Sequence, residues 1–153
     1  MDSVVAKTDC EISFDLSRID FCKTSDLIMA SYWGEKRTEA MNARAFVNSL
    51  CAGAYLDGEQ VGFGRAITDY CVFAYLADVI VWPGFRGRGI GKRIVTSLLD
   101  HPELAGVGHW SLTTADAQDL YKRFGFKPAG DGRYMRLDRP GLSIREGSAT
   151  PVS

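Results

Sequence analysis

The first part of the chain alternates between strand and helix patterns. Apolar residues occupy every second position from Glu11 to Leu16, which predicts a strand. The segment near Phe21 to Trp33 has the spacing of a helix, and Thr38 is a residue type that caps the start of a second one. The apolar stripe of this second helix, spaced i, i+3, i+4 and i+7, consists of Ala43, Phe46, Val47 and Leu50.

A hairpin and a long apolar strand follow. Residues 51–56 and 60–68 flank Asp57-Gly58, a dipeptide that favours a tight turn between two strands. Residues from Val72 to Val81 are apolar except for Asp78. Apolar residues on both sides of a strand are typical of a central strand that is covered on each face.

The chain then changes to a glycine-rich loop over residues 82–91, which precedes a helix. We expect this helix to end before Pro102, because the residue before a proline disfavours helical backbone. Its apolar stripe consists of Ile90, Ile94, Val95, Leu98 and Leu99.

Shorter elements complete the pattern. His109 to Thr114 predicts a strand, and residues 126–129 and 133–137 predict a closing hairpin around residues 130–132. Between the strand and the hairpin lies a second helix, which we expect to end at Gly125. Its apolar stripe consists of Ala117, Leu120, Tyr121 and Phe124.

The order of these elements predicts the fold class. The unit of strand, loop, helix and strand predicts a parallel crossover, whereas the first half is mostly antiparallel. We therefore expect a mixed α/β sheet with helices on both faces. The length of 153 residues suits one domain, which we expect over residues 1–138, with a loose polar tail over residues 139–153.

Composition and charge exclude several classes of protein. The chain has 18 basic and 19 acidic residues, a net charge of −1, which disfavours a general nucleic-acid binder. The longest apolar run has eight residues, and a membrane span needs about 20. The first twenty residues are rich in charge and lack the apolar core of a signal peptide, so we expect a cytoplasmic protein.

Cysteine and histidine usage predicts neither a redox motif nor a metal site. The four cysteines form no C-x-x-C pair, and three of them lie among apolar neighbours, which favours buried free thiols. The chain has two histidines, so a metal site built on histidine is not expected.

The glycine-rich loop carries the main chemical prediction. Glycines let the backbone approach a ligand, and the free N–H groups at the start of a helix attract anions. The basic side chains Arg86, Arg88, Lys92 and Arg93 favour a pyrophosphate ligand. The spacing fits neither a Walker loop nor a G-x-G-x-x-G dinucleotide motif. The alternative is a structural turn with a solvated basic rim.

The loop and a later segment resemble the GNAT superfamily of acyl-CoA-dependent N-acetyltransferases. Arg86-x-x-Gly89-x-Gly91 matches the family signature R/Q-x-x-G-x-G/A, and residues 120–126 resemble its Y-x-x-x-G-F segment. The close match covers roughly residues 74–137. The first 73 residues, where substrate choice usually lies, fit the family only in outline.

The resemblance implies a GNAT-like fold, in which two parallel strands splay apart and hold acetyl-CoA, with no metal. It implies that main-chain groups of Val79 to Val81 bind the pantetheine arm. Thr114 stands where the family often has asparagine, and it could bind the ligand or cap a helix. The residues implied to hold the pyrophosphate are Arg86, Gly87, Arg88, Gly89, Ile90, Gly91 and Lys92.

The resemblance also implies two catalytic residues. Tyr121 matches the tyrosine that protonates the leaving thiolate in many family members, although its apolar stripe also fits a core tyrosine. Asp78 matches an acidic residue that positions or deprotonates the amine in some members. A structural carboxylate bonded to loop amides is an equally good interpretation of Asp78, because an unpaired buried charge is costly.

The expected function is the transfer of acetyl from acetyl-CoA to a primary amine of a small molecule or peptide in a ternary complex. Tyr32 and Trp33 could wall the acceptor site, or could simply end a helix. The alternatives are a non-catalytic acyl-CoA sensor with the same fold and a nucleotide or RNA phosphate binder, which the failed Walker pattern disfavours. Because many family members are dimers, the resemblance leaves a homodimer open.

Overall fold

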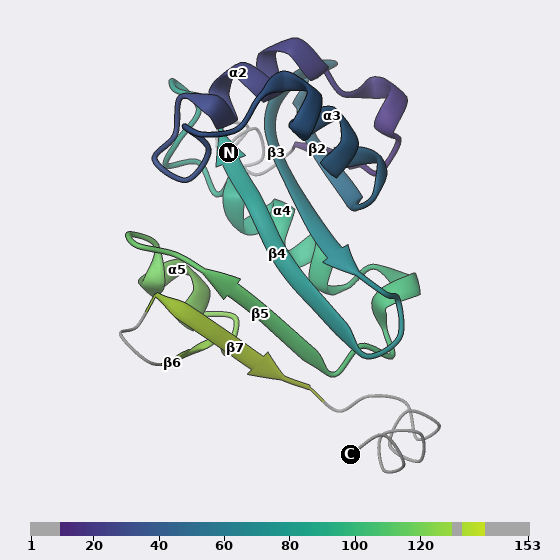
Figure 1. The fold of residues 1–153 in the computed structure, drawn as a ribbon, viewed down its shortest axis with the longest axis vertical. Coiled ribbons are helices and arrows are strands. Elements are labelled where there is room, and N and C mark those ends of the chain that lie inside the picture. Colours follow the sequence, from purple (N-terminus) through teal and green to yellow (C-terminus); the bar gives the residue numbers. More distant parts are fainter. Residues whose placement is uncertain (1–9, 130–132, 140–153) are drawn as a thin grey trace, which may run out of the picture. The chain divides into compact units, whose positions relative to one another are not determined.

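The structure is a computed structural model that describes residues 10–129 and 133–139. The described strands form one seven-stranded mixed sheet in the order β1-β2-β3-β4-β5-β7-β6 (Figure 1). The strands are β1 (Glu11–Ser13), β2 (Leu50–Leu56), β3 (Glu59–Thr68), β4 (Phe73–Val81), β5 (His109–Thr113), β6 (Lys127–Ala129) and β7 (Tyr134–Asp138). The helices are α2 (Phe21–Met29), α3 (Glu39–Val47), α4 (Ile90–Leu99) and α5 (Gln118–Lys122), with short 3-10 turns η1 (Leu16–Arg18) and η2 (Pro102–Leu104).

The strand pairing confirms the expected mixed sheet. β1 is antiparallel to β2, and β7 is antiparallel to both β5 and β6. β4 and β5 are parallel, with Phe73–Tyr75 opposite His109–Ser111. α4 lies between these two strands in the sequence, so the predicted strand–helix–strand crossover is confirmed.

The chain packs as two compact units, which β3 and β4 both enter. The first contains the described residues up to Arg65 together with Asp78–Leu98. The second contains Ala66–Ala77 and the described residues from Leu99 onward.

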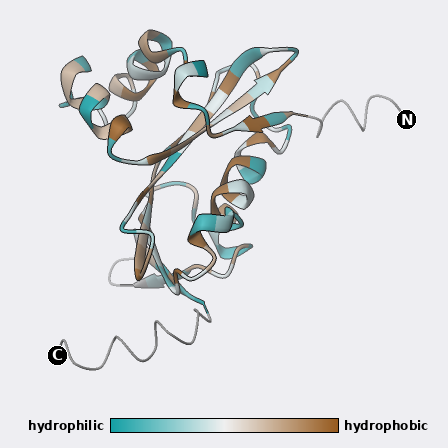
Figure 2. Ribbon diagram, turned by 90° about the vertical axis from the view of Figure 1, so that its right-hand side faces the viewer, coloured by the Kyte–Doolittle hydropathy of each residue, from teal (hydrophilic) through white to brown (hydrophobic). Residues whose placement is uncertain are grey.

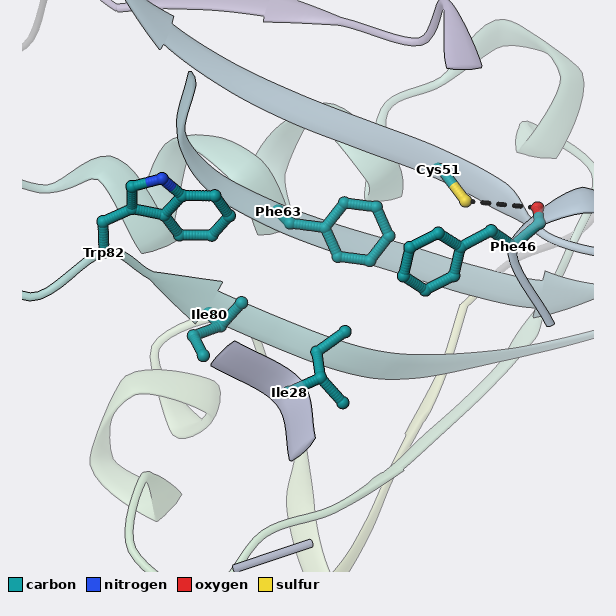
Figure 3. Packing of buried hydrophobic residues seen from close by; sticks show 6 residues of the cluster. All are labelled: Ile28, Phe46, Cys51, Phe63, Ile80 and Trp82. Carbon is teal, nitrogen blue, oxygen red and sulfur yellow. Dashed lines mark hydrogen bonds between the residues drawn. The ribbon is translucent and has the colours of Figure 1, made fainter. Parts of the chain in front are cut away.

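In the first unit, helices cover both faces of the sheet. Phe63 of β3 packs against Phe46 of α3, with ring centroids 4.6 Å apart, in a cluster that also contains Ile28 of α2 (Figure 3). The neighbouring Gly62 and Gly64 face the other way, because a Cβ atom at either position would meet Ile94 of α4. Alternate residues of a strand point to opposite faces, so α2 and α3 lie on one face and α4 on the other.

The buried side of α4 is the one predicted. Its five stripe residues are all at most 6% exposed. Hydrophobic and hydrophilic residues alternate around the helices in Figure 2, as expected for helices with one buried side.

The helix expected to reach Trp33 is shorter. Asp20 caps α2 by accepting a hydrogen bond from Lys23 N–H, and the helix ends at Met29. A tight turn follows, in which Ser31 N–H donates to the carbonyl of Ile28 and Gly34 lies against that same carbonyl. This turn places residues 31–36 outside the helix and presents Tyr32 and Trp33, 53% and 38% exposed, on its surface.

The predicted buried stripe of α3 is correct for Phe46 but not for the other helix residues, whereas the predicted cap is confirmed. Thr38 accepts a hydrogen bond from Met41 N–H, as expected. Val47 is 68% exposed, however, and the buried residues of the helix are Asn42 and Phe46. Asn42 turns inward because its amide donates to the hydroxyl of Ser25 at 2.9 Å, a polar contact that an apolar-periodicity argument cannot detect.

The hairpin and the central strand are confirmed. Asp57 and Gly58 have φ values of 51° and 83°, the left-handed backbone that a two-residue hairpin turn requires. In β4, the buried residues alternate with partly buried ones along Ala74–Val81. Asp78, within this strand, also has a positive φ of 54°, so the strand is locally distorted there.

The second unit contains the closing strands around a buried Trp110, and Arg139 forms hydrogen bonds within this unit. The predicted tail begins at Arg139, yet Arg139 donates to the carbonyls of Gly108 and Leu99. Residues 140–153, and residues 130–132 around which the closing hairpin was predicted, lie outside the described residues. The first predicted strand is also shorter than expected, because it stops at Ser13 and Leu16 belongs to η1.

The cysteine prediction holds for two of the four thiols. All four are free, but only Cys10 and Cys51 are buried, and Cys22 and Cys71 are exposed. The Cys51 thiol donates to the carbonyl of Phe46 in the core shown in Figure 3. Burial raises the pKa of Cys51 to about 12, so this thiol stays protonated.

Candidate functional site

The loop between β4 and α4 has the backbone that the sequence predicted. Gly84, Gly87 and Gly89 have φ values of 95°, 79° and 81°, a region that other residues rarely adopt. A Cβ atom at any of the three would meet open space, so the backbone conformation, and not crowding, requires glycine there. The loop therefore presents main chain without side chains at these points.

The first turn of α4 follows directly. Ile90 anchors it, because its side chain is 2% exposed. A Cβ atom at Gly91 would lie 3.6 Å from the Val81 side chain, so the helix begins close to the end of β4. The turn contains no acidic residue, which leaves the positive end of the helix dipole uncompensated.

The basic residues of the loop have different roles. Lys92 is exposed, and Arg88 lies over the Phe85 ring at 5.3 Å from its centroid. Arg86 Nε donates to the carbonyl of Val81 at 3.1 Å and so ties the loop to the end of β4. Arg93 donates to the carbonyl of Cys10 at 2.8 Å, which gives this fourth cation a structural contact.

The strand segment implied to bind pantetheine is partly engaged within the protein. The carbonyl of Val81 accepts the Arg86 bond, and the Ile80 side chain is buried in the core cluster of Figure 3. Val79 and Val81 are partly exposed.

Asp78 is the centre of a buried cluster of polar residues. Its side chain is 0% exposed and accepts three hydrogen bonds. Trp33 Nε1 donates to Oδ1 at 3.0 Å, whereas Arg37 Nη1 and Arg65 Nε donate to Oδ2 at 2.8 Å and 2.7 Å. The structural interpretation of Asp78 therefore gains support, but with side-chain donors in place of the loop amides that were expected.

These partners decide the protonation state of Asp78. Burial of the carboxyl group raises its pKa, but the hydrogen bond from Arg37 and the charge of Arg65 outweigh the burial and hold the pKa below its ordinary value. The group is thus a carboxylate at neutral pH and a weak proton acceptor.

A second layer of polar residues holds the two arginines. Arg37 Nη1 also donates to Asn42 at 3.4 Å, and Arg65 Nη1 donates to the hydroxyl of Ser49 at 2.8 Å. Asn42 in turn bonds Ser25 of α2. The Asp78 cluster, comprising Trp33, Arg37, Arg65 and Asp78, therefore links the turn after α2 to β3 and β4.

The two arginines were missed by the sequence analysis. Arg65 is the single charge in the predicted strand 60–68, as Asp78 is in its neighbour, so two opposite lone charges on paired apolar strands could have revealed this ion pair. Arg37 lies in a polar loop next to the exposed Lys36, and nothing in the sequence distinguishes it.

In the second unit, the structure places Thr114 and Tyr121 on either side of one turn. Thr114 Oγ1 accepts from Ala117 N–H at 3.0 Å, so it caps the turn that leads into α5. Tyr121 is 7% exposed, and its ring meets that of Phe126 edge-on at 6.0 Å between centroids. Its catalytic role stays a prediction.

Residues 10–129 and 133–139 contain neither a cluster of metal-ligating side chains nor a membrane-spanning helix. No group of three or more His, Cys, Asp or Glu side chains there could hold a metal ion. No helix in the same residues has the length and hydropathy needed to cross a membrane.

Comparison with known proteins identifies the family. The acetyltransferase (GNAT) domain family matches residues 47–128, more than half of the chain. An uncharacterised N-acetyltransferase of Pyropia yezoensis is 30% identical over 94 residues, which are 61% of this chain and 54% of that protein. The chain thus spans about half the length of this curated relative.

Solved structures show the same fold. A protein of Xanthomonas campestris pv. campestris, assigned to the GNAT family, is 40% identical with a TM-score of 0.75, and the match covers 78% of this chain and 85% of that one. The PaiA N-acetyltransferase of Thermoplasma acidophilum, in complex with coenzyme A, is 19% identical with a TM-score of 0.68, over 87% of this chain and 99% of that one. The resemblance that the loop motif suggested is confirmed, and the chain belongs to the GNAT family of acetyltransferases.

Proposed function

We propose that the protein transfers the acetyl group of acetyl-CoA to a primary amine by direct attack in a ternary complex. The observation that carries the proposal is the loop after β4, where three positive-φ glycines expose main chain beside an uncompensated helix start. Free N–H groups, a helix dipole and exposed cations together suit a pyrophosphate, which coenzyme A contains. The complex of the Thermoplasma structure with coenzyme A is consistent with this donor.

The reaction needs little from the protein beyond positioning and one proton donor. The neutral amine attacks the thioester carbon, the C–S bond breaks, the amine nitrogen loses a proton and the thiolate of coenzyme A gains one. A tyrosine hydroxyl has an ordinary pKa of about 10 and is therefore protonated at neutral pH, so it can donate a proton to the leaving thiolate as the C–S bond breaks. Tyr121 is our candidate for this role.

A pair of glycine variants tests the donor site. Gly89 in the loop and Gly58 in the β2–β3 turn have φ values of 81° and 83°, and a Cβ atom at either would meet open space. Alanine at either position therefore carries the same backbone strain, about 1–2 kcal/mol. The two variants should lose similar stability, but only Gly89→Ala should lose binding of acetyl-CoA.

The assay is the melting temperature with acetyl-CoA, coenzyme A, ATP or NAD. A ligand at 100 times its dissociation constant adds about 2.7 kcal/mol, or about 5–10 °C for a chain of this size. We expect both coenzyme A species to stabilise the wild type and Gly58→Ala, but ATP and NAD to have no effect. If coenzyme A raised the melting temperature of Gly58→Ala and Gly89→Ala equally, the loop would not be the coenzyme A site.

Turnover distinguishes an enzyme from an acyl-CoA sensor. A screen of primary amines with detection of released thiol should show acetylation at a rate that depends on the amine. Binding of coenzyme A without release of thiol by any amine would favour the sensor.

A further inference from the structure

One edge of the Arg37 guanidinium has no partner among the described residues. Arg37 uses Nη1 for both of its side-chain hydrogen bonds, to Asp78 Oδ2 and Asn42 Oδ1. Among residues 10–129 and 133–139, neither Nε nor Nη2 has a hydrogen-bond partner. These two nitrogens form the parallel pair of donors with which arginine binds the two oxygens of a carboxylate.

This free edge is held in place before any ligand binds. The bond to the buried Asp78 fixes the guanidinium, and the main-chain N–H of Arg37 donates to the carbonyl of Gly34 at 3.0 Å. The side chain is nevertheless 24% exposed, so it is reachable from solvent. An arginine that is already oriented loses less entropy when it binds a carboxylate.

The Asp78 cluster also has an excess of positive charge. Two guanidinium groups share one carboxylate, which leaves a net charge of +1, and the Arg65 side chain is only 7% exposed. Glu35 and Lys36 are exposed neighbours in the sequence, and Glu35 forms no ion pair with Arg37. A second anion at Arg37 would balance the charge of the cluster.

Two aromatic residues lie in the turn that precedes Arg37. Trp33 donates to the other oxygen of Asp78. Tyr32 meets the Trp33 ring edge-on, with centroids 5.2 Å apart, and both residues are exposed. Their faces can attract an ammonium group, so a cationic and an anionic part of one small molecule would each have a partner here.

We propose that the acceptor is a small amine that also carries a carboxylate, as a free amino acid does, and that the carboxylate pairs with Nε and Nη2 of Arg37. This inference rests on the proposed acetyltransferase function and names its class of substrate. Arg37 is then a specificity-determining residue, and Asp78 is a positioning residue that acts through it.

Matched acceptors test the proposal. Acetylation of free amino acids is compared with that of their primary amides, which keep the side chain and the amine but lack the charge. Loss of the carboxylate charge also lowers the pKa of the amine and by itself makes the amide more reactive. A preference for the acid would therefore run against this intrinsic effect, and we expect kcat/KM for at least one acid to exceed that of its amide by about tenfold.

Two variants connect this preference to Arg37. Arg37→Lys keeps the charge beside Asp78 but loses the paired donors, and Arg37→Gln loses both. Each variant should raise KM for the acid and reduce the ratio of kcat/KM for the acid to kcat/KM for the amide by about tenfold. Arg44→Gln, which removes an exposed cation from α3, should leave the ratio unchanged.

The outcomes separate this inference from the proposed function. If amides and acids were acetylated with equal kcat/KM, the carboxylate assignment would be overturned but the acetyltransferase function would stand. An equal loss of kcat/KM for acid and amide in Arg37→Lys would show that Arg37 is only structural. A preference for an aminoalkyl phosphate over the amino acid would also overturn the carboxylate assignment. Failure of every amine would refute the inference, and the melting shift with coenzyme A would then decide whether donor binding fails too.

Discussion

Replacing Asp78 with asparagine removes one charge from the Asp78 cluster and changes little else. Asparagine has the shape of aspartate and tolerates the left-handed backbone, so the φ of 54° at this position adds no new strain. The variant leaves Arg37 and Arg65 beside a neutral amide, whose nitrogen would face a donor. It therefore measures the loss of the carboxylate charge and of one accepting oxygen, with no added backbone strain.

The expected loss of stability is large. Removing one partner of a buried ion pair costs about 3–5 kcal/mol, because the other charge is left uncompensated. Arg65 is nearly buried, but water reaches the 24% of Arg37 that is exposed, so we expect the lower part of this range, about 3 kcal/mol. For a chain of this size that corresponds to a melting temperature lower by about 6–12 °C.

The assay is thermal unfolding as a function of pH. The pKa of Asp78 is lowered on folding, so its contribution to stability is fully present above the ordinary value of 3.8 and is lost as the pH falls through the lower folded-state pKa. Wild type and Asp78→Asn should therefore differ most at neutral pH and converge in acid.

Asp138→Asn is the matched control. Asp138 also bonds an arginine, Arg136, and the imidazole of His109, but its side chain is 62% exposed. An exposed pair contributes little, so this variant should melt close to the wild type.

A neutral-pH melting temperature for Asp78→Asn equal to that of the wild type would refute the structural role. If acetyl transfer were also abolished in that stable variant, the interpretation of Asp78 as a catalytic base would be restored. If the variant is destabilised but retains activity per folded molecule, the base role is excluded.

Three further variants probe the rest of the molecule. Tyr121→Phe should reduce kcat strongly with little change in acetyl-CoA binding, measured by thiol release and melting shift, and unchanged turnover would remove Tyr121 from the mechanism. Thr114→Val deletes the acceptor of the Ala117 N–H bond and should cost about 1 kcal/mol in urea unfolding, whereas an unchanged midpoint would show that water replaces the cap. Gly34→Ala would place a Cβ atom against the Ile28 carbonyl, so we expect a marked drop in melting temperature, and a neutral effect would mean that the turn after α2 can open.

The elements that the sequence predicted best are those in which local signals and burial agree. The α4 stripe, the Asp57-Gly58 turn and the Thr38 cap were all placed correctly, because each combines a residue preference with a short-range contact. The backbone of the loop between β4 and α4 was predicted for the same reason, since positive φ at Gly87 and Gly89 follows from residue type and spacing alone.

The errors arise where polar residues are buried through distant partners. Asn42 changes which side of α3 is buried, because it bonds Ser25. That partner is 17 residues away in the sequence, so no local pattern indicates it. The early end of α2 depends on the packing of Gly34 against Ile28, a tertiary contact. Arg37 reaches Asp78 across 41 residues, so no local pattern could predict the cluster that we regard as the acceptor side of the protein.

The hydrogen bonds of Asp78 also limit what its carboxylate can do in catalysis. Each oxygen has two lone pairs, and Oδ2 already accepts from two guanidinium groups, so only Oδ1 could take a proton from an amine. A protonated Asp78 would deprive both arginines of the counter-charge that it supplies, and the lowered pKa reflects that cost. A carboxylate that must stay ionised to hold two arginines is suited to orienting Arg37 and unsuited to accepting protons. In the proposed reaction we therefore expect the amine proton to go to water or to another group, and we expect Asp78 to act through the arginine edge that it orients.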